Sequence, residues 1–522
     1  MKFHDQPQTH FLKVLAQNPE FKDGNDLPIF TTVEVPNERL DDGPKGARFH
    51  VVDYDATRNI FITPENSDIL FKRIKKTLES KKPAGIQKLI GDPQFHAYNC
   101  YAVAATTLLQ FERSLGRSVS WGFSSDAPLL KIAPHAFSDM QAFYSRRDEG
   151  LAFGYFPIVE EKYGFTCLSY DVVVHEITHA ILDGLRSEFM RPSYIDQLAF
   201  HEAFADIVAI LSTLRSPETI THALGLGRKK TAKLSKFSAV ELRETVLTGL
   251  ADDLSTGGNK PLDHLARVRG EPLRNSAKIK PHKSVYKSPK YRGEPHRFGE
   301  VLVAVIINAY LEIWYARVKK LPTDESELVS VERAIEDGVK AADHLLNMCI
   351  RALDYLPPLN IQFPDYLIAI LTSDRETAPD DSRYNYRRIL WKSFRAYGVF
   401  QKCIECAFWR PPGKDKKQCR CPPPANKAST DGNNGNPDII YGHGSHEDMQ
   451  WDKERVYRFI WENFSALGLY KEAFTQVISV RPVRRQGPDG SPVRETIVEY
   501  TQRFRRCAKI SRPSYSQSKN TF

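Results

Sequence analysis

Residues 171–182 set a group of polar residues among aliphatic ones, and this segment constrains the fold more than any other. The segment reads D-V-V-V-H-E-I-T-H-A-I-L, so His175, Glu176 and His179 stand among aliphatic residues. A helix of this composition is apolar nearly all round and has to be buried. Burying polar side chains without partners costs about 2–7 kcal/mol for each group. The fold must therefore supply partners for all three side chains.

The spacing of these three residues predicts a metal site. Residues four apart lie on one face of a helix, so His175 and His179 can direct two ring nitrogens at one ion. Glu176 lies beside them without being needed as a ligand. A carboxylate next to a metal-bound water can remove a proton from that water, because zinc lowers the water's pKa towards neutrality. The H-E-x-x-H pattern therefore indicates a hydrolytic zinc site with Glu176 as general base.

A catalytic zinc ion needs a third protein ligand, and residues 200–211, F-H-E-A-F-A-D-I-V-A-I-L, supply a candidate in Glu202. Asp206 follows one helical turn later on the same face. It is placed to accept a hydrogen bond from the second ring nitrogen of a ligand histidine. His201 stays open: it is a fourth metal neighbour, a substrate contact, or a surface or hydrogen-bonded histidine, and we favour the last.

Together the two segments resemble the thermolysin-like zinc metallopeptidases, the gluzincin group, in which H-E-x-x-H is followed by a second helix with E-x-x-x-D. The resemblance covers about residues 45–400 and implies a zinc-dependent endopeptidase. The site residues that it implies are the zinc ligands His175, His179 and Glu202, the general base Glu176, and the supporting Asp206. The interval between His179 and Glu202 is longer than the family usually has, which predicts an enlarged loop at residues 186–196.

Residues 141–144, Q-A-F-Y, precede a predicted strand–turn–strand and are similar to the substrate-binding edge strand of that family. The resemblance implies that Gln141, Ala142 and Phe143 bind an extended peptide, since an edge strand can hold one by backbone hydrogen bonds. Gln141 stands where the family has asparagine, which leaves the specificity for peptide bonds open. The alternative is an ordinary surface hairpin.

His296 stands just before an apolar helix predicted at residues 301–315. In the thermolysin type a histidine in this setting stabilises the oxyanion of the tetrahedral intermediate, so the resemblance implies this role for His296. The acidic residue that usually orients this ring is missing, and Tyr291 stands in about its place. The ring is therefore held either by Glu294 or by no residue. His282 is the alternative donor. It belongs to a basic segment, residues 278–292, that either attracts acidic substrates or forms a solvated loop.

The distribution of patterns along the chain predicts an α+β fold, thermolysin-like, with the zinc helix between a β-rich and a helical half. Short β-like runs such as residues 48–54 characterise residues 1–165, with a helix predicted at residues 98–114. Residues 166–400 are predicted to be mainly helical. Apolar periodicity places helices in this half at residues 329–355, 363–371 and 384–397.

Residues 401–447, rich in Cys, Pro and Asn, are predicted to be a linker or insertion. Residues 448–522 are predicted to form a small extension with a helix at 449–466, a hairpin at 475–504 and a disordered tail. Four of the eight cysteines lie in the linker: Cys403, Cys406, Cys419 and Cys421. They are expected to be free thiols, with a second, structural zinc site or disulfides as alternatives. The other four are expected to be buried thiols: Cys100, Cys167, Cys349 and Cys507.

Composition limits the partners. The chain has 522 residues, 41% of them hydrophobic, which is enough to bury a large core in two or three domains. No run reaches the roughly 18 apolar residues of a membrane span, because Asn308 and Glu312 interrupt the most apolar one. The net charge of +9 is mild and no nucleic-acid motif accompanies it. We expect a peptide or protein substrate, and neither a membrane nor a nucleic acid as partner; the oligomeric state is not predicted.

The first residues, M-K-F-H-D-Q, contain no apolar segment and no cleavage site of a secretion signal. We therefore expect a cytoplasmic enzyme, with export by an unconventional route as the alternative. Two other functions stay open. One is an exopeptidase or amidase of the same fold. The other is a non-catalytic scaffold that zinc stabilises and whose residues 401–522 bind a partner.

Overall fold

The structure is a computed structural model that describes residues 8–123, 129–159, 162–190, 195–226, 229–247, 276, 279–321, 327–400, 453–467, 469–470, 473–486 and 492–503. The chain divides into two compact units. The first comprises residues 1–422 and 485–493, and the second comprises residues 423–484 and 494–522. The two halves that the sequence predicts up to residue 400 thus belong to one unit and share one hydrophobic core, which extends from Val14 to Phe400.

The N-terminal part of the first unit is built from strands and three helices. In chain order they are β1 (Thr9–Leu15), β2 (Phe30–Pro36), β3 (Phe49–Val51), β4 (Tyr54–Asp55), β5 (Ile60–Phe61), α1 (Ser67–Ser80), α2 (Pro83–Ile90), α3 (Pro93–Leu115), β6 (Leu130–Ser138), β7 (Ala142–Ser145), β8 (Gly150–Val159) and β9 (Lys162–Phe165). A short 3-10 helix, η1 (Thr166–Leu168), follows.

The rest of the unit is mainly helical. Its helices are α4 (Tyr170–Leu185), η2 (Ser187–Met190), α5 (Ile195–Thr213), α6 (Pro217–Leu224), η3 (Leu234–Phe237), α7 (Ala239–Leu242), the π-helical η4 (Arg243–Leu247), η6 (Val285–Lys287), α11 (Pro289–Arg292), α12 (Pro295–Val318), α13 (Val331–Arg351), η7 (Ala352–Tyr355), α14 (Phe363–Thr377) and α15 (Tyr386–Ala396). Two short strands, β10 (Thr231–Lys233) and β11 (Leu328–Ser330), pair with each other.

The chain is therefore a mixed α and β protein, in agreement with the α+β prediction. The N-terminal part contains more helix than the patterns predicted, because α1 and α2 accompany the expected α3. Helix α1 buries Leu70, Ile74 and Leu78 at intervals of four residues, and the side chain of Asn66 caps its first turn. These local signals identify α1 as an amphipathic helix, although its mean hydropathy is low.

The main sheet has the strand order β3-β6-β8-β7, with β9 also paired to β8. Strands β3, β6 and β8 are parallel, whereas β7 and β9 run antiparallel to β8. In the part of the chain that the structure describes, β7 pairs only with β8, so it is an edge strand, as the family resemblance predicts. This places residues 142–145 at the margin of the sheet.

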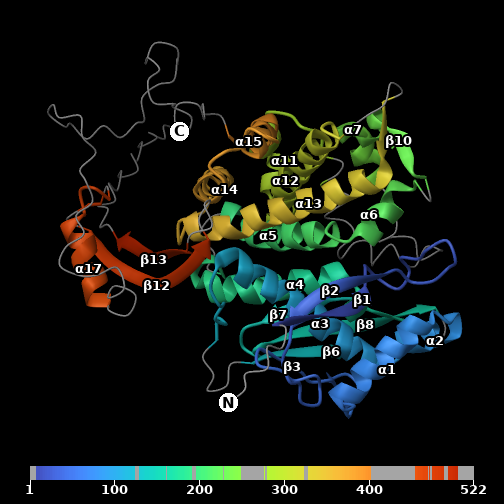
Figure 1. Cartoon of the computed structure of the whole chain (residues 1–522). Coiled ribbons are helices and arrows are strands. Elements are labelled where there is room, and N and C mark those ends of the chain that lie inside the picture. Colours follow the sequence, from blue (N-terminus) through green and yellow to red (C-terminus); the bar gives the residue numbers. More distant parts are fainter. Residues whose placement is uncertain are drawn as a thin grey trace, which may run out of the picture. The chain divides into compact units, whose positions relative to one another are not determined.

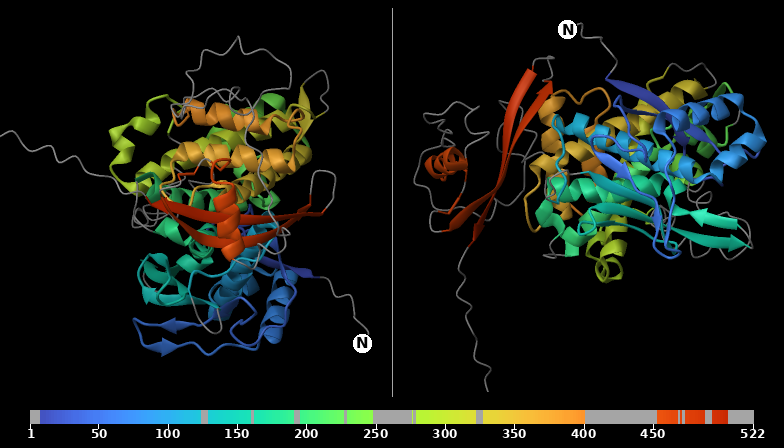
Figure 2. Two further views of the ribbon diagram at one scale, coloured as in Figure 1. Left: turned by 90° about the vertical axis from the view of Figure 1, so that its left-hand side faces the viewer. Right: turned by 90° about the horizontal axis from the view of Figure 1, so that it is seen from below.

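Helix α4 lies between the sheet and the helical part. It packs against α5 on one side and against α3 and β7 on the other. Figure 1 shows α5 and α12 to α15 on one side of α4 and the strands of the main sheet on the other, and the left-hand view of Figure 2 keeps this division. Near the end of α4 only a glycine fits, because a Cβ atom at Gly184 would lie 1.7 Å from the carbonyl oxygen of Ser120.

Helix α12 forms the centre of the helical part, between α5 and α13. Among the described residues it is long and apolar enough by composition to cross a membrane, and the bent pair α5 and α6 passes the same test. Within the apolar window of α12, 72% of the residues are buried inside the protein, which is typical of a core helix. Gly299 allows close packing, since a Cβ atom there would lie 3.0 Å from the carbonyl oxygen of Ala199 on α5.

The second unit contains helix α17 (Lys453–Glu462) and most of the hairpin of β12 (Phe474–Gln486) and β13 (Pro492–Arg503), near the predicted positions. Val456, Ile460 and Val477 form its small core. The predicted linker at residues 401–447, the disordered tail and Cys507 lie outside the described residues, as do the four clustered cysteines: Cys403, Cys406, Cys419 and Cys421. The remaining cysteines, Cys100, Cys167 and Cys349, are free and buried, as predicted.

Candidate metal centre

The two histidines of the H-E-x-x-H segment point their ring nitrogens at a common position. Both lie on α4, and the Nε2 atoms of His175 and His179 are 2.9 Å apart. The rings meet edge to face, with centroids 4.5 Å apart. Each residue is only 8% exposed, so neither ring is solvated like a surface histidine. The helical spacing of four residues produces this convergence within α4 alone.

Glu202 on α5 completes a group of three possible metal ligands. Its Oε2 atom lies 3.6 Å from His175 Nε2 and 3.7 Å from His179 Nε2. Around a tetrahedral zinc ion with bonds of about 2.0–2.1 Å, ligand atoms are about 3.3 Å apart. The observed separations bracket this value, and two histidines with one carboxylate form a common catalytic zinc set. The residues therefore fit a zinc ion with three protein ligands.

The protonation states also fit a metal site. Burial lowers the pKa of His179 well below its usual value, so its ring is neutral at pH 7. Burial opposes ionisation of Glu202, but the neighbouring His179 and His175 lower the pKa of this carboxyl below its ordinary value. A metal binds the neutral imidazole and the ionised carboxylate. Both groups are therefore in the form that coordination requires.

Asp206 holds one of the histidines in place from the next turn of α5. Its Oδ1 atom lies 2.8 Å from His175 Nδ1. The carboxylate accepts the Nδ1 proton, which leaves the lone pair of His175 on Nε2, facing Glu202 and His179. Burial raises the pKa of Asp206, and the hydrogen bond with His175 opposes that rise. The contact fixes both the tautomer and the orientation of the His175 ring.

Glu176 lies next to His175 along α4 and is only 2% exposed. It does not belong to the group of three ligands. A buried carboxylate beside two metal-directed histidines has the position that the sequence pattern assigns to a general base.

His296 lies on the open side of the same group. It belongs to the first turn of α12, its side chain is 73% exposed, and its Nε2 atom is 3.8 Å from Glu202 Oε2. The side chain of Glu294 caps α12 and also contacts His296 Nδ1 at 2.6 Å. Glu294, rather than Tyr291, is therefore the residue that orients this ring. His282, the alternative donor, instead contacts Ser284 Oγ through its Nδ1 atom at 2.7 Å.

Burial lowers the pKa of His296, but the hydrogen bond with Glu294 and the charges of Glu202 and Glu294 outweigh this effect and raise it overall. The ring therefore keeps its second proton to a higher pH than a free histidine does. Because the Glu294 carboxylate accepts the Nδ1 proton, Nε2 carries a proton only when the ring is charged.

The edge strand β7 is joined to the zinc helix by a buried carboxylate that the sequence patterns did not single out. Asp183, on α4, is fully buried, accepts a hydrogen bond from the Tyr144 hydroxyl at 2.7 Å, and lies 3.0 Å from Arg146 Nε. Its position one turn after His179, in an otherwise apolar run, is the signal that could have identified it. These contacts hold β7 beside α4.

The three predicted substrate-binding residues lie at the start of β7. Gln141 precedes the strand, and its carbonyl oxygen accepts a hydrogen bond from Gly154 N at 2.9 Å. Ala142 pairs with Phe153 of β8. Phe143 is 45% exposed and its ring stacks on that of Phe137. The exposed aromatic side chain of Phe143 is available to an approaching ligand.

His201 is not an ordinary surface residue. Its ring is buried and stacks parallel to that of His179, with centroids 4.6 Å apart. Burial lowers the pKa of His201 to about 4, so the ring is neutral. It does not belong to the group of three possible metal ligands. The stacking supports the position of His179 from the side of α5.

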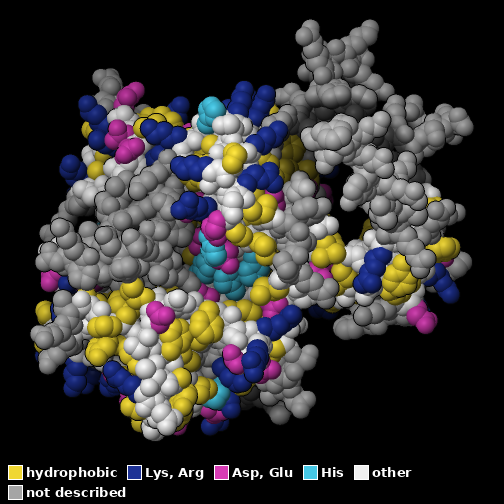
Figure 3. Space-filling view, turned by 180° about the vertical axis from the view of Figure 1, so that it is seen from behind, with side chains coloured by type: hydrophobic (Ala, Val, Ile, Leu, Met, Phe, Trp, Pro, Cys, Tyr) yellow, Lys and Arg dark blue, Asp and Glu magenta, His cyan; other side chains and the backbone are white. Residues whose placement is uncertain are grey.

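Figure 3 shows a cluster of histidine side chains, with acidic side chains beside them, recessed at the centre of one face of the molecule. The exposure of His296 and the partial exposure of Glu202 agree with access from solvent. A separate cavity of about 750 Å³ is lined by other residues, including Glu34, Arg113, Asp343 and Asn347, and by none of the three ligands. This cavity is therefore separate from the metal-directed group.

Removing the carboxylate of Asp206 should weaken zinc binding without removing a ligand. We expect Asp206→Ala to reduce zinc affinity about 10–100-fold, because His175 loses the partner that fixes its tautomer. Competition with a coloured chelator measures the change. Asp171→Ala is the matched control, since Asp171 lies in the first turn of α4 and its carboxylate accepts hydrogen bonds from Ser169 and Val172. Equal affinities of the two variants would contradict this role of Asp206.

The chain was also compared with known proteins. No protein-family model and no curated protein matches it.

Proposed function

We propose that this chain is a zinc-dependent peptidase, an endopeptidase with a thermolysin-like fold. One observation carries the proposal: His175 and His179 from α4 and Glu202 from α5 converge on one point. The buried Glu176 and the Asp206–His175 hydrogen bond provide further support. Burying such a group costs free energy unless a cation compensates it, which favours a metal at this point.

His175, His179 and Glu202 would hold the zinc ion, which polarises a carbonyl group and lowers the pKa of water. Glu176 takes the proton of the attacking water and then delivers it to the departing amine, since one carboxylate can serve both steps. His296, in its charged form, donates its Nε2–H group to the oxygen that becomes negatively charged. Glu294 keeps this ring in place through Nδ1.

Strand β7 offers a place for the substrate chain. No strand among the described residues pairs with its outer edge, so an extended peptide can add to it by backbone hydrogen bonds. Tyr144 and Arg146 attach the strand to Asp183 on the zinc helix, which keeps the peptide near the metal ligands. Phe143 contributes an exposed apolar side chain on this strand.

The proposal is tested by incubating the full chain with a peptide library of mixed sequence and identifying the products by mass spectrometry. We expect internal cleavage by zinc-loaded protein, loss of cleavage after chelation, and recovery when zinc is restored. Products shortened only from one end would indicate an exopeptidase, and release of ammonia without chain cleavage would indicate an amidase. Stoichiometric zinc without any hydrolysis would contradict the proposal and favour the scaffold.

His296→Ala should reduce turnover while zinc stays bound. We expect kcat to fall about 10²–10³-fold, because one donor to the oxyanion is lost and no zinc ligand is removed. Rates on one library substrate, measured at equal zinc content, give the effect.

His282→Ala is the matched control for this variant, because His282 is an exposed histidine before η6 and contacts Ser284. We expect it to keep the parent rate. If His282→Ala reduced kcat and His296→Ala did not, the assignment of the oxyanion donor would be reversed.

A further inference from the structure

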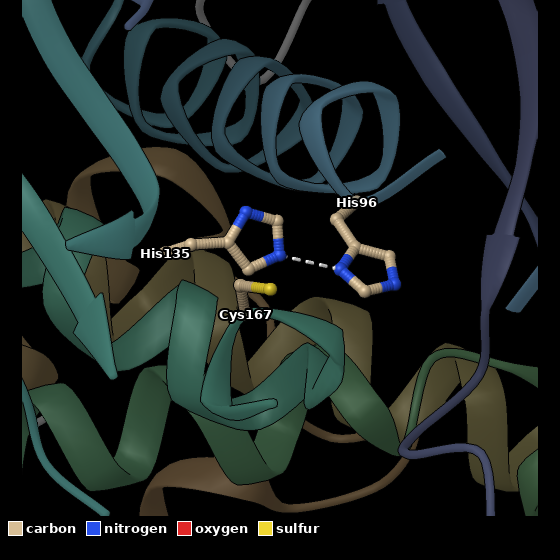
Figure 4. Close-up of side chains that lie close together, drawn as sticks. All are labelled: His96, His135 and Cys167. Carbon is tan, nitrogen blue, oxygen red and sulfur yellow. Dashed lines mark hydrogen bonds between the residues drawn. The ribbon is translucent and has the colours of Figure 1, made fainter. Parts of the chain in front are cut away.

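A second group of potential metal ligands lies in the N-terminal part of the first unit. It consists of His96 on α3, His135 on β6 and Cys167 on η1, and their ligand atoms all lie within 4.8 Å of one another. All three are buried, with exposures of 1%, 5% and 0%. Figure 4 shows the two rings facing each other, with the sulfur of Cys167 beside the gap between them.

The outer nitrogen of each ring is bonded to a group that only accepts protons. His135 Nδ1 lies 2.8 and 3.0 Å from the two carboxylate oxygens of Asp53. His96 Nε2 lies 2.7 Å from the carbonyl oxygen of Ile90. A carboxylate or carbonyl accepts a hydrogen bond, so both outer nitrogens carry their protons. In a neutral ring the inner nitrogen then carries a lone pair.

These two inner nitrogens, His96 Nδ1 and His135 Nε2, lie 2.7 Å apart, as the dashed line in Figure 4 marks. Two lone pairs at this distance repel each other unless a cation lies between them. Only a proton or a metal ion can fill this role. A proton would give the two rings one positive charge, and the Asp53 carboxylate beside His135 would balance this charge.

Cys167 distinguishes the two cations. A proton shared by two rings needs no third donor, whereas a thiolate beside two imidazoles is a common set for zinc. Asp53 and the Ile90 carbonyl are the kind of groups that orient metal-bound histidines from behind. Cys100 lies one turn after His96 on α3, and its thiol donates to the Cys167 carbonyl at 3.4 Å. Cys100 does not belong to the group of three, but it is the buried thiol next to it and the candidate for a fourth ligand if the site closes around an ion.

We propose that His96, His135 and Cys167 hold a second, structural zinc ion, separate from the H-E-x-x-H centre. The 2.7 Å between the two nitrogens would widen by about 0.6 Å to reach tetrahedral spacing. The ion would join α3, β6 and η1, and η1 ends two residues before α4 begins. It would thus clamp the start of the H-E-x-x-H helix to the sheet. The site does not depend on peptidase activity.

The first test is the zinc content of the full chain, measured by mass spectrometry. In a His175→Ala/His179→Ala background we expect zinc to remain, and we expect Cys167→Ser to remove one further zinc ion per chain. Cys349→Ser is the matched control, because Cys349 is an equally buried thiol on α13. Equal zinc content in all three proteins would overturn the proposal and leave a proton between the rings.

The second test uses cobalt and does not depend on the stability of the Cys167 variant. In a chain with serine at Cys403, Cys406, Cys419 and Cys421, bound Co²⁺ should show a sulfur-to-cobalt charge-transfer band in the near ultraviolet. Loss of the band in His135→Ala, but not in Cys349→Ser, would support the site. A cobalt spectrum with tetrahedral bands but without the charge-transfer band would exclude Cys167 as a ligand and overturn the proposal. A weaker band in Cys100→Ser would identify the fourth ligand.

Discussion

Glu176→Gln is expected to lower kcat/KM for peptide hydrolysis about 10²–10⁴-fold while the zinc content stays unchanged. The substitution keeps the size of the side chain but removes its ability to take a proton from water. Glu176 is buried beside His175 and does not belong to the three-ligand group, so its amide should not disturb zinc binding. Rates on a single library substrate, together with zinc analysis of the same samples, measure both effects.

Glu312→Gln is the matched control for this prediction, since Glu312 is an exposed glutamate on α12. We expect this control to hydrolyse the substrate at the parent rate. If Glu176→Gln kept the parent rate with zinc bound, Glu176 would not be the general base, and the proposed mechanism would be wrong. If the wild type and the variant were both inactive with zinc bound, the non-catalytic scaffold would be the function that the results favour.

His179→Ala is expected to abolish stoichiometric zinc binding at the H-E-x-x-H centre and hydrolysis with it. The substitution leaves only His175 and Glu202, and two protein ligands do not make the usual zinc site. Zinc analysis after dialysis measures the loss as one ion per chain relative to the parent. The zinc content of the variant is compared with that of the parent and not with zero, because the second proposed site also holds zinc.

His201→Ala is the matched control, because His201 is buried and its ring stacks on that of His179. We expect this variant to keep its zinc, although it leaves a cavity beside His179 and lowers stability. Equal loss of zinc in both variants would make His201 a ligand, which is one of the roles that its position next to Glu202 leaves open. The two variants therefore distinguish the loss of a zinc ligand, at His179, from the loss of a packed ring, at His201.

Much of the H-E-x-x-H centre follows from local pattern. The intervals between His175 and His179 and between Glu202 and Asp206 are one helical turn, and each pair needs only a helix to share a face. The apolar residues around them predict burial, and each helix is buried. The edge position of β7 was predicted from a family resemblance to residues 141–144, and the sheet order places it there.

Other contacts of this centre could not be predicted from local pattern. The residue that orients His296 was open between Glu294 and none, and the cap of α12 decides for Glu294. The contact between Asp183 and Tyr144 depends on how β7 packs on α4. The packing of His201 against His179 likewise depends on how α5 lies beside α4. Each of these depends on the relative placement of elements, which no periodicity encodes.

By itself, the sequence determined which residues are paired on single helices and which runs must be buried. These properties depend on the helical repeat and on the free energy of transferring side chains from water, both of which act locally. Only the tertiary structure decided which distant groups meet. His96, His135 and Cys167 are unremarkable residues on a helix, a strand and a short turn, and they come together because the sheet packs under α3. Such convergence is set by the packing of the whole core.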